Sequence, residues 1–383
     1  MQGGKAINFY APPMVVERLI GVYHFFSKIA DDHSVPGYAH GDSQVGGAGN
    51  ALANYERVLT PNGPVEINLL KKGDIVVNTH GSFSKVTGVY PQGESDIFRV
   101  KFGNGEHLDC DLNHRWSVRN HHDRKFMTLT TQEIVTKGLF RKTKKDSRNP
   151  KWKHAGYRPR WMLPIIDFVE FNERAIRVDP YTMGCLIGDG DVRCRITSED
   201  KEIFDRIPYP LGKRDNKRGE NAWACAIKGI KADYLSYGLK CKSVDKFIPE
   251  QYLFNSKEVR LELLRGLMDT DGCCSKQGEV FFATSSHRLA KDFVWLVKSL
   301  GAIVRSICEE DGGDFEIKGR KCSRQKTYRI VFNLPGEKIF HLQRKQSRVR
   351  VIPRTHIYLT GIEYLGKHQA TCISVDAKDA LFV

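Results

Sequence analysis

Two stretches of nine residues decide the fold of this chain: Thr182-Met-Gly-Cys-Leu-Ile-Gly-Asp-Gly190 and Leu264-Arg-Gly-Leu-Met-Asp-Thr-Asp-Gly272. Each has a glycine at its third position, Gly184 or Gly266, and another small residue four positions later. Residues four apart lie on one face of a helix, so this spacing allows two helices to approach closely. The alternative is two unrelated buried helices, each ended by a C-terminal glycine.

Both stretches end in Asp-Gly, which places Asp189 and Asp271 at the helix ends. If the two helices pair, these carboxylates lie side by side. Neighbouring carboxylates repel each other unless a cation lies between them, and Mg²⁺ is the usual ion with oxygen ligands. The sequence therefore predicts a magnesium site at Asp189 and Asp271.

The two stretches resemble the LAGLIDADG motif of homing endonucleases, although Ile187 stands where the family name has Asp. The resemblance implies a nuclease for double-stranded DNA, with Asp189 and Asp271 as ligands of the Mg²⁺ cofactor. It also implies an α/β domain with pseudo-twofold symmetry, which we place at residues 166–350. Within it, the residue pattern predicts strands at 192–197, 280–284, 302–308 and 327–333, a helix that starts at Ser198, and a capped amphipathic helix at 285–301. Lys228 and Lys326 are candidates for assisting basic residues by position, and plain surface lysines are the alternative.

A basic segment precedes the first motif. The chain of 383 residues has a formal charge of +15, and residues 119–160 contain thirteen Lys or Arg but three Asp or Glu, interleaved with aromatic residues. Such a mixture suits a nucleic-acid backbone, although a solvated face is the usual alternative. The predicted DNA-binding residues are Arg141, Lys142, Lys144, Lys145, Arg148, Lys151 and Lys153.

Composition excludes several other classes. No run of 18 apolar residues exists, so the sequence predicts no membrane span, and the N-terminus has no signal-peptide core. The ten cysteines form no CxxC pair and no zinc pattern, which favours a reducing, cytoplasmic setting. We expect a monomer in a bacterial host.

Residues 51–165 have short apolar runs separated by glycine turns, which predict a compact all-β unit. Two short strands are expected around Pro61-Asn-Gly63, and separate strands at 86–90 and 97–102. Further strand pairs are expected at 355–364 and 370–383. The order Leu-Thr-Pro-Asn-Gly, Leu-Lys-Lys-Gly-Asp-Ile-Val and Asn-His-Arg-Trp-Ser-Val is similar to the Hint splicing domain of inteins.

The intein resemblance implies a splice junction at Asn50–Ala51. It also implies that His114 contacts this junction, where an imidazole can protonate the departing amide nitrogen as general acid. Most inteins begin with Cys or Ser, whereas this chain has Ala51, and Asp111 replaces a usual Thr. Inteins of the class 3 type lack that first nucleophile, and Trp116 and Cys372 match the Trp and Cys of this type. The resemblance thus implies Cys372 as nucleophile, with a core cysteine as the alternative, and no cofactor for splicing.

The whole chain is predicted to be α+β, with an all-β Hint domain (51–165 and 351–383) split by the endonuclease domain. Residues 1–50 contain an amphipathic run at 15–30. Its end, Ala30-Asp-Asp32, and the tract Gly46-Gly-Ala-Gly49 resemble a tailed-phage portal protein. An arbitrary extension is the alternative. The resemblance implies a terminal His-Asn and a downstream flank after Val383. Two other hypotheses are a standalone nuclease with a Hint-like DNA-binding module, and an inactive remnant.

Overall fold

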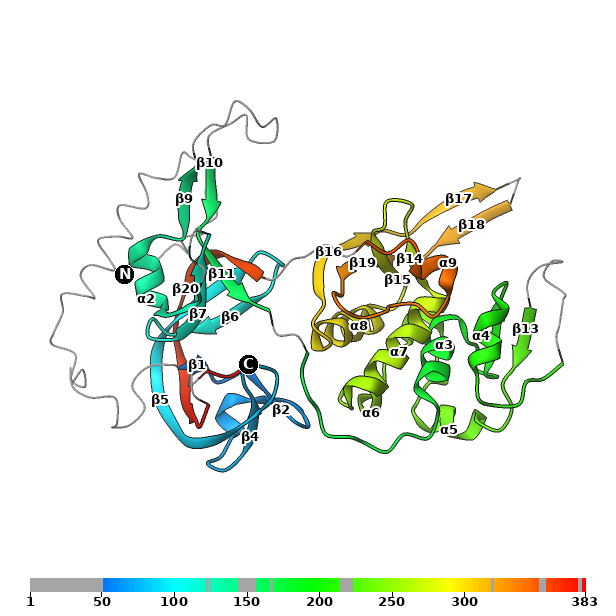
Figure 1. Cartoon of the computed structure of the whole chain (residues 1–383), viewed down its shortest axis with the longest axis horizontal. Helices are drawn as coiled ribbons and strands as arrows, with labels where there is room; N and C mark the ends of the chain where they lie inside the picture. The colour runs from blue at the N-terminus through cyan, green and yellow to red at the C-terminus, as the bar shows by residue number, and fades with distance from the viewer. Residues whose placement is uncertain are drawn as a thin grey trace.

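The computed structural model has two parts, one rich in strands and one built around paired helices (Figure 1). We call residues 51–165 with 356–383 the barrel part, and residues 168–350 the paired-helix part. The portal-like segment lies outside the described residues. The structure describes residues 51–121, 123, 125–143, 156–165, 168–213, 223–317, 320–350, 356–377 and 381–383.

Four strands of the barrel part form a closed ring. In order of pairing they are β5, β6, β1 and β20, and β20 pairs again with β5. The ring joins the first and last described segments of the chain, because β1 follows Ala51 directly and β20 lies near the C-terminal end. The bounds are β1 (Leu52–Ala53), β5 (Phe83–Phe102), β6 (His107–Cys110) and β20 (His356–Val375).

The two longest strands differ from the sequence prediction. Residues 86–90 and 97–102 belong to the single strand β5, and the expected pair at 355–364 is one part of the single strand β20. Both strands are 20 residues long and pair along their length, with register shifts such as those at Leu359/Gly361 and Tyr364/Gly366. Gly93, with its φ of 69°, stands between the two strands expected at 86–90 and 97–102, and it lies beside a register shift inside a continuous ladder instead of in a turn.

The remaining barrel elements cover and extend the ring. The hairpin predicted around Pro61-Asn-Gly63 is confirmed, since β2 pairs with β3 across it. Helix α2 begins with a capping box between Thr130 and Glu133. The bounds are β2 (Arg57–Thr60), β3 (Gly63–Glu66), η2 (Ile67–Leu69), β4 (Ile75–Val77), β7 (Arg115–Asn120), β8 (Met127–Thr130), α2 (Thr131–Lys137), β9 (Phe140–Thr143), β10 (Gly156–Pro159) and β11 (Trp161–Pro164).

The two motif stretches form helices that pack together as predicted. They lie in α3 (Pro180–Asp189) and α7 (Lys257–Thr270). A Cβ added to Gly184 would lie 2.3 Å from the Leu263 carbonyl oxygen, and one added to Gly266 would lie 2.2 Å from that of Tyr181. Each glycine therefore faces the backbone of the other helix, and only glycine fits at this contact.

Strands and shorter helices flank the pair (Figure 1). The first half of the paired-helix part contains β12 (Arg195–Ser198), α4 (Lys201–Arg206), β13 (Trp223–Ala226), α5 (Lys231–Ser236), η4 (Ser243–Asp245) and α6 (Glu250–Leu253). The second half contains β14 (Gly272–Cys274), β15 (Val280–Thr284), α8 (His287–Ser299), β16 (Ile303–Glu310), β17 (Gly313–Ile317), β18 (Arg320–Arg324), β19 (Thr327–Asn333) and α9 (Gln343–Gln346).

In the second half, the predicted strands and the predicted capped helix are confirmed. Strands β15 and β19 have the predicted bounds, and Ser286 caps α8 by accepting a bond from the Leu289 N–H. In the first half, Ser198 does not begin a helix as expected. It ends β12, and α4 starts three residues later.

The two parts meet at a small apolar cluster in which Leu59 and Val77 of the barrel part pack with Val169 and Phe171. The fully buried Arg260 of α7 supports this junction by donating to the carbonyl oxygens of Val169 and Ser299. In the described residues, no helix has the length and apolar character that crossing a membrane requires.

Candidate functional site

The two motif acids lie at neighbouring helix ends. Asp189 is the last residue of α3, and Asp271 is the C-cap of α7. The helices still touch at this level, because a Cβ added to Gly188 would lie 2.1 Å from Thr270 Oγ1 and 3.5 Å from Asp271 Oδ2. The close packing that begins at Gly184 therefore brings the two carboxylates together.

The electrostatics of Asp271 reflect this proximity. Part of its surface remains open to solvent, while protein surrounds the rest. This desolvation first, and the charge of Asp189 second, raise the pKa of Asp271 to about 6. The charges of Lys246 and Lys345 act in the opposite direction.

Two buried lysines, which the sequence did not indicate, hold the helix ends. Lys246 Nζ donates to the carbonyl oxygens of Leu186, Gly188 and Gly190, at 3.3, 2.7 and 2.9 Å. Lys345 Nζ does the same at the end of α7, to Met268, Asp269 and Gly272 at 3.1, 2.8 and 2.7 Å. A cation at a helix C-terminus satisfies its last carbonyl groups and opposes the helix dipole.

The two lysines proposed from sequence are not these buried ones. Lys228 is exposed, and Lys326 is an exposed residue paired with Glu309. Lys246 and Lys345 are distant from the motifs in sequence, and no motif signal accompanies them. Only their burial in the folded chain distinguishes them from other lysines.

A cavity of about 350 Å³ opens beside Asp271. Lys246 contributes to its wall, and the hydroxyl-bearing residues Ser243, Thr284 and Ser285 line it as well. A carboxylate, a cation and several hydroxyl groups thus face one small space, as is suitable for a phosphate bound through a metal ion and hydrogen bonds.

The donor set can be tested against Mg²⁺. Among the described residues no cluster of three or more His, Cys, Asp or Glu could hold a metal ion. Mg²⁺, however, is commonly held by one or two carboxylates together with substrate phosphates and water. Asp271 lines an open cavity, and Asp189 lies close enough to raise the pKa of Asp271, so the two carboxylates fit that mode.

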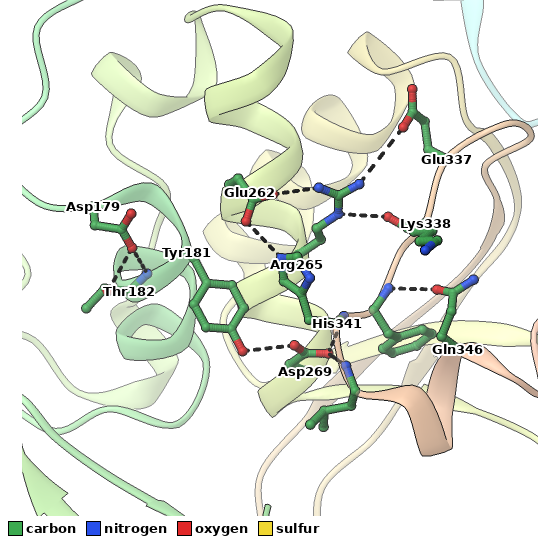
Figure 2. A network of polar contacts seen from close by, with 12 residues as sticks. Asp179, Tyr181, Thr182, Glu262, Arg265, Asp269, Glu337, Lys338, His341 and Gln346 are labelled. Atoms are coloured by element: carbon green, nitrogen blue, oxygen red, sulfur yellow. Dashed lines mark hydrogen bonds and ion pairs between the residues drawn. The ribbon is translucent and has the colours of Figure 1, made fainter. Parts of the chain in front are cut away.

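A polar network connects α3 and α7 to the segment before α9 (Figure 2). Asp269, the sixth residue of the second motif, accepts a bond of 2.9 Å from the Tyr181 hydroxyl group of α3. It also accepts from the backbone N–H groups of His341 and Leu342, at 3.1 and 3.2 Å. This carboxylate therefore holds the segment that leads into α9 and Lys345.

In the barrel part, the structure brings Ala51 and Cys372 together. Leu52 pairs with Thr371, and both Ala51 and Cys372 belong to one buried apolar cluster. Burial, followed by the charge of Asp111, raises the pKa of the Cys372 thiol to about 12. Asn50, the other side of the expected junction, lies outside the described residues.

His114 and Trp116 lie next to each other, with ring centroids 4.8 Å apart in an edge-to-face arrangement. Thr131, which we did not predict, connects them: its hydroxyl group donates to the His114 carbonyl oxygen and accepts from Trp116 Nε1, at 3.3 and 3.0 Å. Its backbone N–H also donates to His114 O at 2.9 Å. Thr131 thus positions the His114 backbone and the Trp116 indole.

Of the predicted DNA-binding residues, the structure describes Arg141 and Lys142. Both lie on β9, opposite Arg158 and Tyr157 of β10 in a two-stranded hairpin (Figure 1). Lys144, Lys145, Arg148, Lys151 and Lys153 lie outside the described residues.

Comparisons with known proteins agree with part of this interpretation. Residues 258–328 match the family model of the LAGLIDADG-like domain, so the chain contains a domain of this kind. The replicative DNA helicase DnaB of Mycobacterium intracellulare is 27% identical over 310 residues, which cover 78% of this chain and 50% of the helicase. The chain thus spans about half the length of the curated relative it matches.

Solved intein structures are also similar to parts of the chain. The gp41-1 intein has 21% identity and a TM-score of 0.19, over 22% of this chain and 60% of that chain. A gp41-1 variant in which Ala, Trp and Cys replace Cys, Phe and Asp has 23% identity, a TM-score of 0.19 and the same coverage. The MchDnaB-1 intein has 22% identity and a TM-score of 0.18, over 20% of this chain and 66% of that chain.

Proposed function

We propose that this chain is an intein of the class 3 type that carries a LAGLIDADG homing endonuclease. The barrel part is its Hint splicing domain, the paired-helix part is its endonuclease, and residues 1–50 belong to a portal-like host protein. The strand register and the shared buried cluster that bring Ala51 and Cys372 together support the splicing proposal. The paired carboxylates of Asp189 and Asp271 support the nuclease proposal.

The splicing reaction begins at the Asn50–Ala51 bond. The sulfur of Cys372 attacks the Asn50 carbonyl group, and His114 protonates the Ala51 nitrogen as the amide breaks. Trp116 packs against His114 and keeps the imidazole in its buried position. The product is a thioester on Cys372, which a Ser, Thr or Cys of a downstream flank then accepts.

Upstream cleavage tests this assignment. The chain is incubated with hydroxylamine, which captures a thioester, and release of residues 1–50 is followed on a gel. Cys372→Ala is expected to abolish release, while Cys308→Ala, which removes an exposed thiol on β16, leaves it unchanged. Equal activity of the two variants would contradict the proposal. Adding a downstream His-Asn-Ser or His-Asn-Thr flank is expected to yield ligated flanks.

The proposed endonuclease cuts double-stranded DNA at the ends of α3 and α7. Asp189 and Asp271 would hold Mg²⁺, which when bound activates water and stabilises the leaving oxygen. Lys246 and Lys345 keep the two helix ends in place and supply positive charge beside the acids. The β9–β10 hairpin, with Arg141 and Lys142, provides backbone contacts to the DNA.

A plasmid carrying the uninterrupted host gene tests the nuclease. Asp189→Asn and Asp271→Asn are each expected to lower Mg²⁺-dependent cutting at least about 1,000-fold, because each removes several kcal/mol of metal-assisted stabilisation. Asp191→Asn is the matched control, since Asp191 pairs with Arg195 just after α3. DNA binding, measured by gel shift, should persist in all three variants. If the unaltered chain binds this DNA in Mg²⁺ without cutting it, the nuclease proposal fails.

A further inference from the structure

The register of the barrel places Ala51 between a carboxyl group and a thiol. Leu52 pairs with Thr371 on β20 and with Cys110 on β6. Both pairings are antiparallel, so one step back along the chain from Leu52 corresponds to one step forward on each partner. The residues flanking Ala51 are therefore Cys372 on one side and Asp111 on the other.

The contacts of Asp111 agree with this register. Its backbone N–H donates to the Ala51 carbonyl oxygen at 3.0 Å. Burial raises the pKa of its carboxyl group, and the backbone groups of His114, Asn113 and Ala51 oppose this rise. Its Oδ1 atom is enclosed and accepts no hydrogen bond from the described residues. On the opposite side, Cys372 packs in the same buried cluster as Ala51. The Asp111 backbone is thus bonded to Ala51, and its carboxylate lies near the amide of the bond that is proposed to break.

The proposed first step leaves one proton without an acceptor. Burial raises the pKa of the Cys372 thiol to about 12, so near neutral pH the sulfur is protonated and needs a base to attack. Burial also raises the pKa of Asp111, to about 6, although its three backbone bonds oppose this. A carboxylate with this pKa is ionised at neutral pH and is a stronger base than an ordinary one. Three ionisable residues lie near this pair. The charge of Arg115 opposes the rise in the pKa of Cys372, burial and the Asp111 charge raise the pKa of Cys110, and the backbone N–H of His114 donates to the Asp111 carbonyl oxygen.

We propose that Asp111 is the general base of the first splicing step and removes the Cys372 proton as the sulfur attacks. This inference rests on the proposed splicing function. The C–S bond forms, the bond between the Asn50 carbonyl carbon and the Ala51 nitrogen breaks, and that nitrogen keeps the electron pair. Asp111 gains the thiol proton and His114 gives one to the nitrogen, so the number of protons is conserved. Asp111 thereby acts as a catalytic residue as well as closing a turn.

The variant Asp111→Asn separates these two roles, because Asn keeps an oxygen that accepts the turn's backbone bonds but cannot take a proton. Release of residues 1–50 from the full chain in hydroxylamine is measured between pH 4.5 and 8. The unaltered chain should lose activity about tenfold per pH unit below about pH 6. Asp111→Asn should be at least about 100-fold slower at pH 7 and lack this limb. A loss under tenfold with the acid limb retained would overturn the proposal.

In Asp111→Asn, the rate at which Cys372 is alkylated should not fall with the rate of release. The Asp111 charge raises the pKa of Cys372, so its removal should leave alkylation of Cys372 by iodoacetamide as fast or faster, as measured by peptide mass. Alkylation and release that decline together would mean a disturbed turn and would overturn the role as base. If Asp111→Asn does not fold, Asp111→Ser is used with the same expectations. Unimpaired release in Cys372→Ala would sink the proposed function itself, whereas an inactive Cys372→Ala with a normal Asp111→Asn would sink the role of Asp111 alone.

Discussion

The two halves of the paired-helix part have the same arrangement at the end of the motif helix but different structure around it. In each half, an Asp stands at the end of a motif helix and a buried lysine binds three of its last carbonyl groups. The surroundings differ. The second half has a four-stranded sheet, while the described residues of the first half form a two-stranded one. The sixth motif position is the buried apolar Ile187 in one half and the hydrogen-bonded Asp269 in the other.

Each lysine segment is also anchored on the opposite half. The Lys246 carbonyl oxygen accepts a bond of 2.6 Å from Ser286, the N-cap of α8. Arg344, next to Lys345, forms an ion pair with Asp200, the N-cap of α4. The helix end with its lysine is therefore the unit that the two halves share, whereas the sheet around it varies.

The largest expected effect comes from the contact that the halves share equally. Gly184→Ala should lower the free energy of unfolding by about 3 kcal/mol or more, because its Cβ would meet the Leu263 backbone at 2.3 Å. Gly188→Ala should cost less, since its Cβ would meet the Thr270 side chain, which can rotate away. Urea denaturation measures both. Equal losses in the two variants would contradict the expectation that a clash with the backbone costs more than a clash with a side chain.

Removing the lysines tests whether the repeated unit matters equally in both halves. Lys246→Met and Lys345→Met each leave three carbonyl groups without their donor, and each should lower stability by about 2 kcal/mol. Lys228→Met, at an exposed site, is the control and should change stability little. If one of the two substitutions left stability unchanged, the two helix ends would not be equivalent.

The sixth motif position differs between the halves, and in the second half Asp269 should contribute to stability through its hydrogen bonds. Asp269→Ala removes the acceptor for Tyr181, His341 and Leu342 and is expected to cost about 1.5–2 kcal/mol. Tyr181→Phe, which removes one of these bonds, should cost about 1 kcal/mol. Thermal unfolding in the presence of a chelator measures both changes. A larger effect for Tyr181→Phe would mean that Asp269 does not organise the segment before α9.

The smallest expected effect is a pH-dependent gain in the free energy of unfolding. The pKa of Asp271 is raised in the folded chain, so its favourable contribution is present below about pH 4 and is lost as the pH rises towards 6. Asp271→Asn should therefore stabilise the metal-free chain above pH 6, by about 1 kcal/mol because water screens the open side. Denaturation at pH 4 and pH 7.5 with a chelator measures the difference. A gain that is independent of pH would contradict the raised pKa of Asp271.

Much of the fold was predictable from local sequence signals. The glycine spacing of the motifs indicated the α3–α7 contact, and serine caps and apolar runs located α8, β15 and β19. The two long barrel strands were divided wrongly, because a glycine in a bulge and a glycine in a turn have the same sequence signal. Only the partner strand shows that hydrogen bonding continues past it.

The candidate residues divide in the same way. Asp189, Asp271, His114, Trp116 and Cys372 stand in recognisable motifs, so the sequence by itself indicated them. Lys246, Lys345 and Thr131 have no such context, and the sequence could mark Asp111 only as a departure from the usual Thr. Their positions depend on helix packing and strand register across long separations, as when two antiparallel pairings set Asp111 and Cys372 on either side of Ala51. Register is decided by the burial of whole strand faces, which no short stretch of sequence encodes.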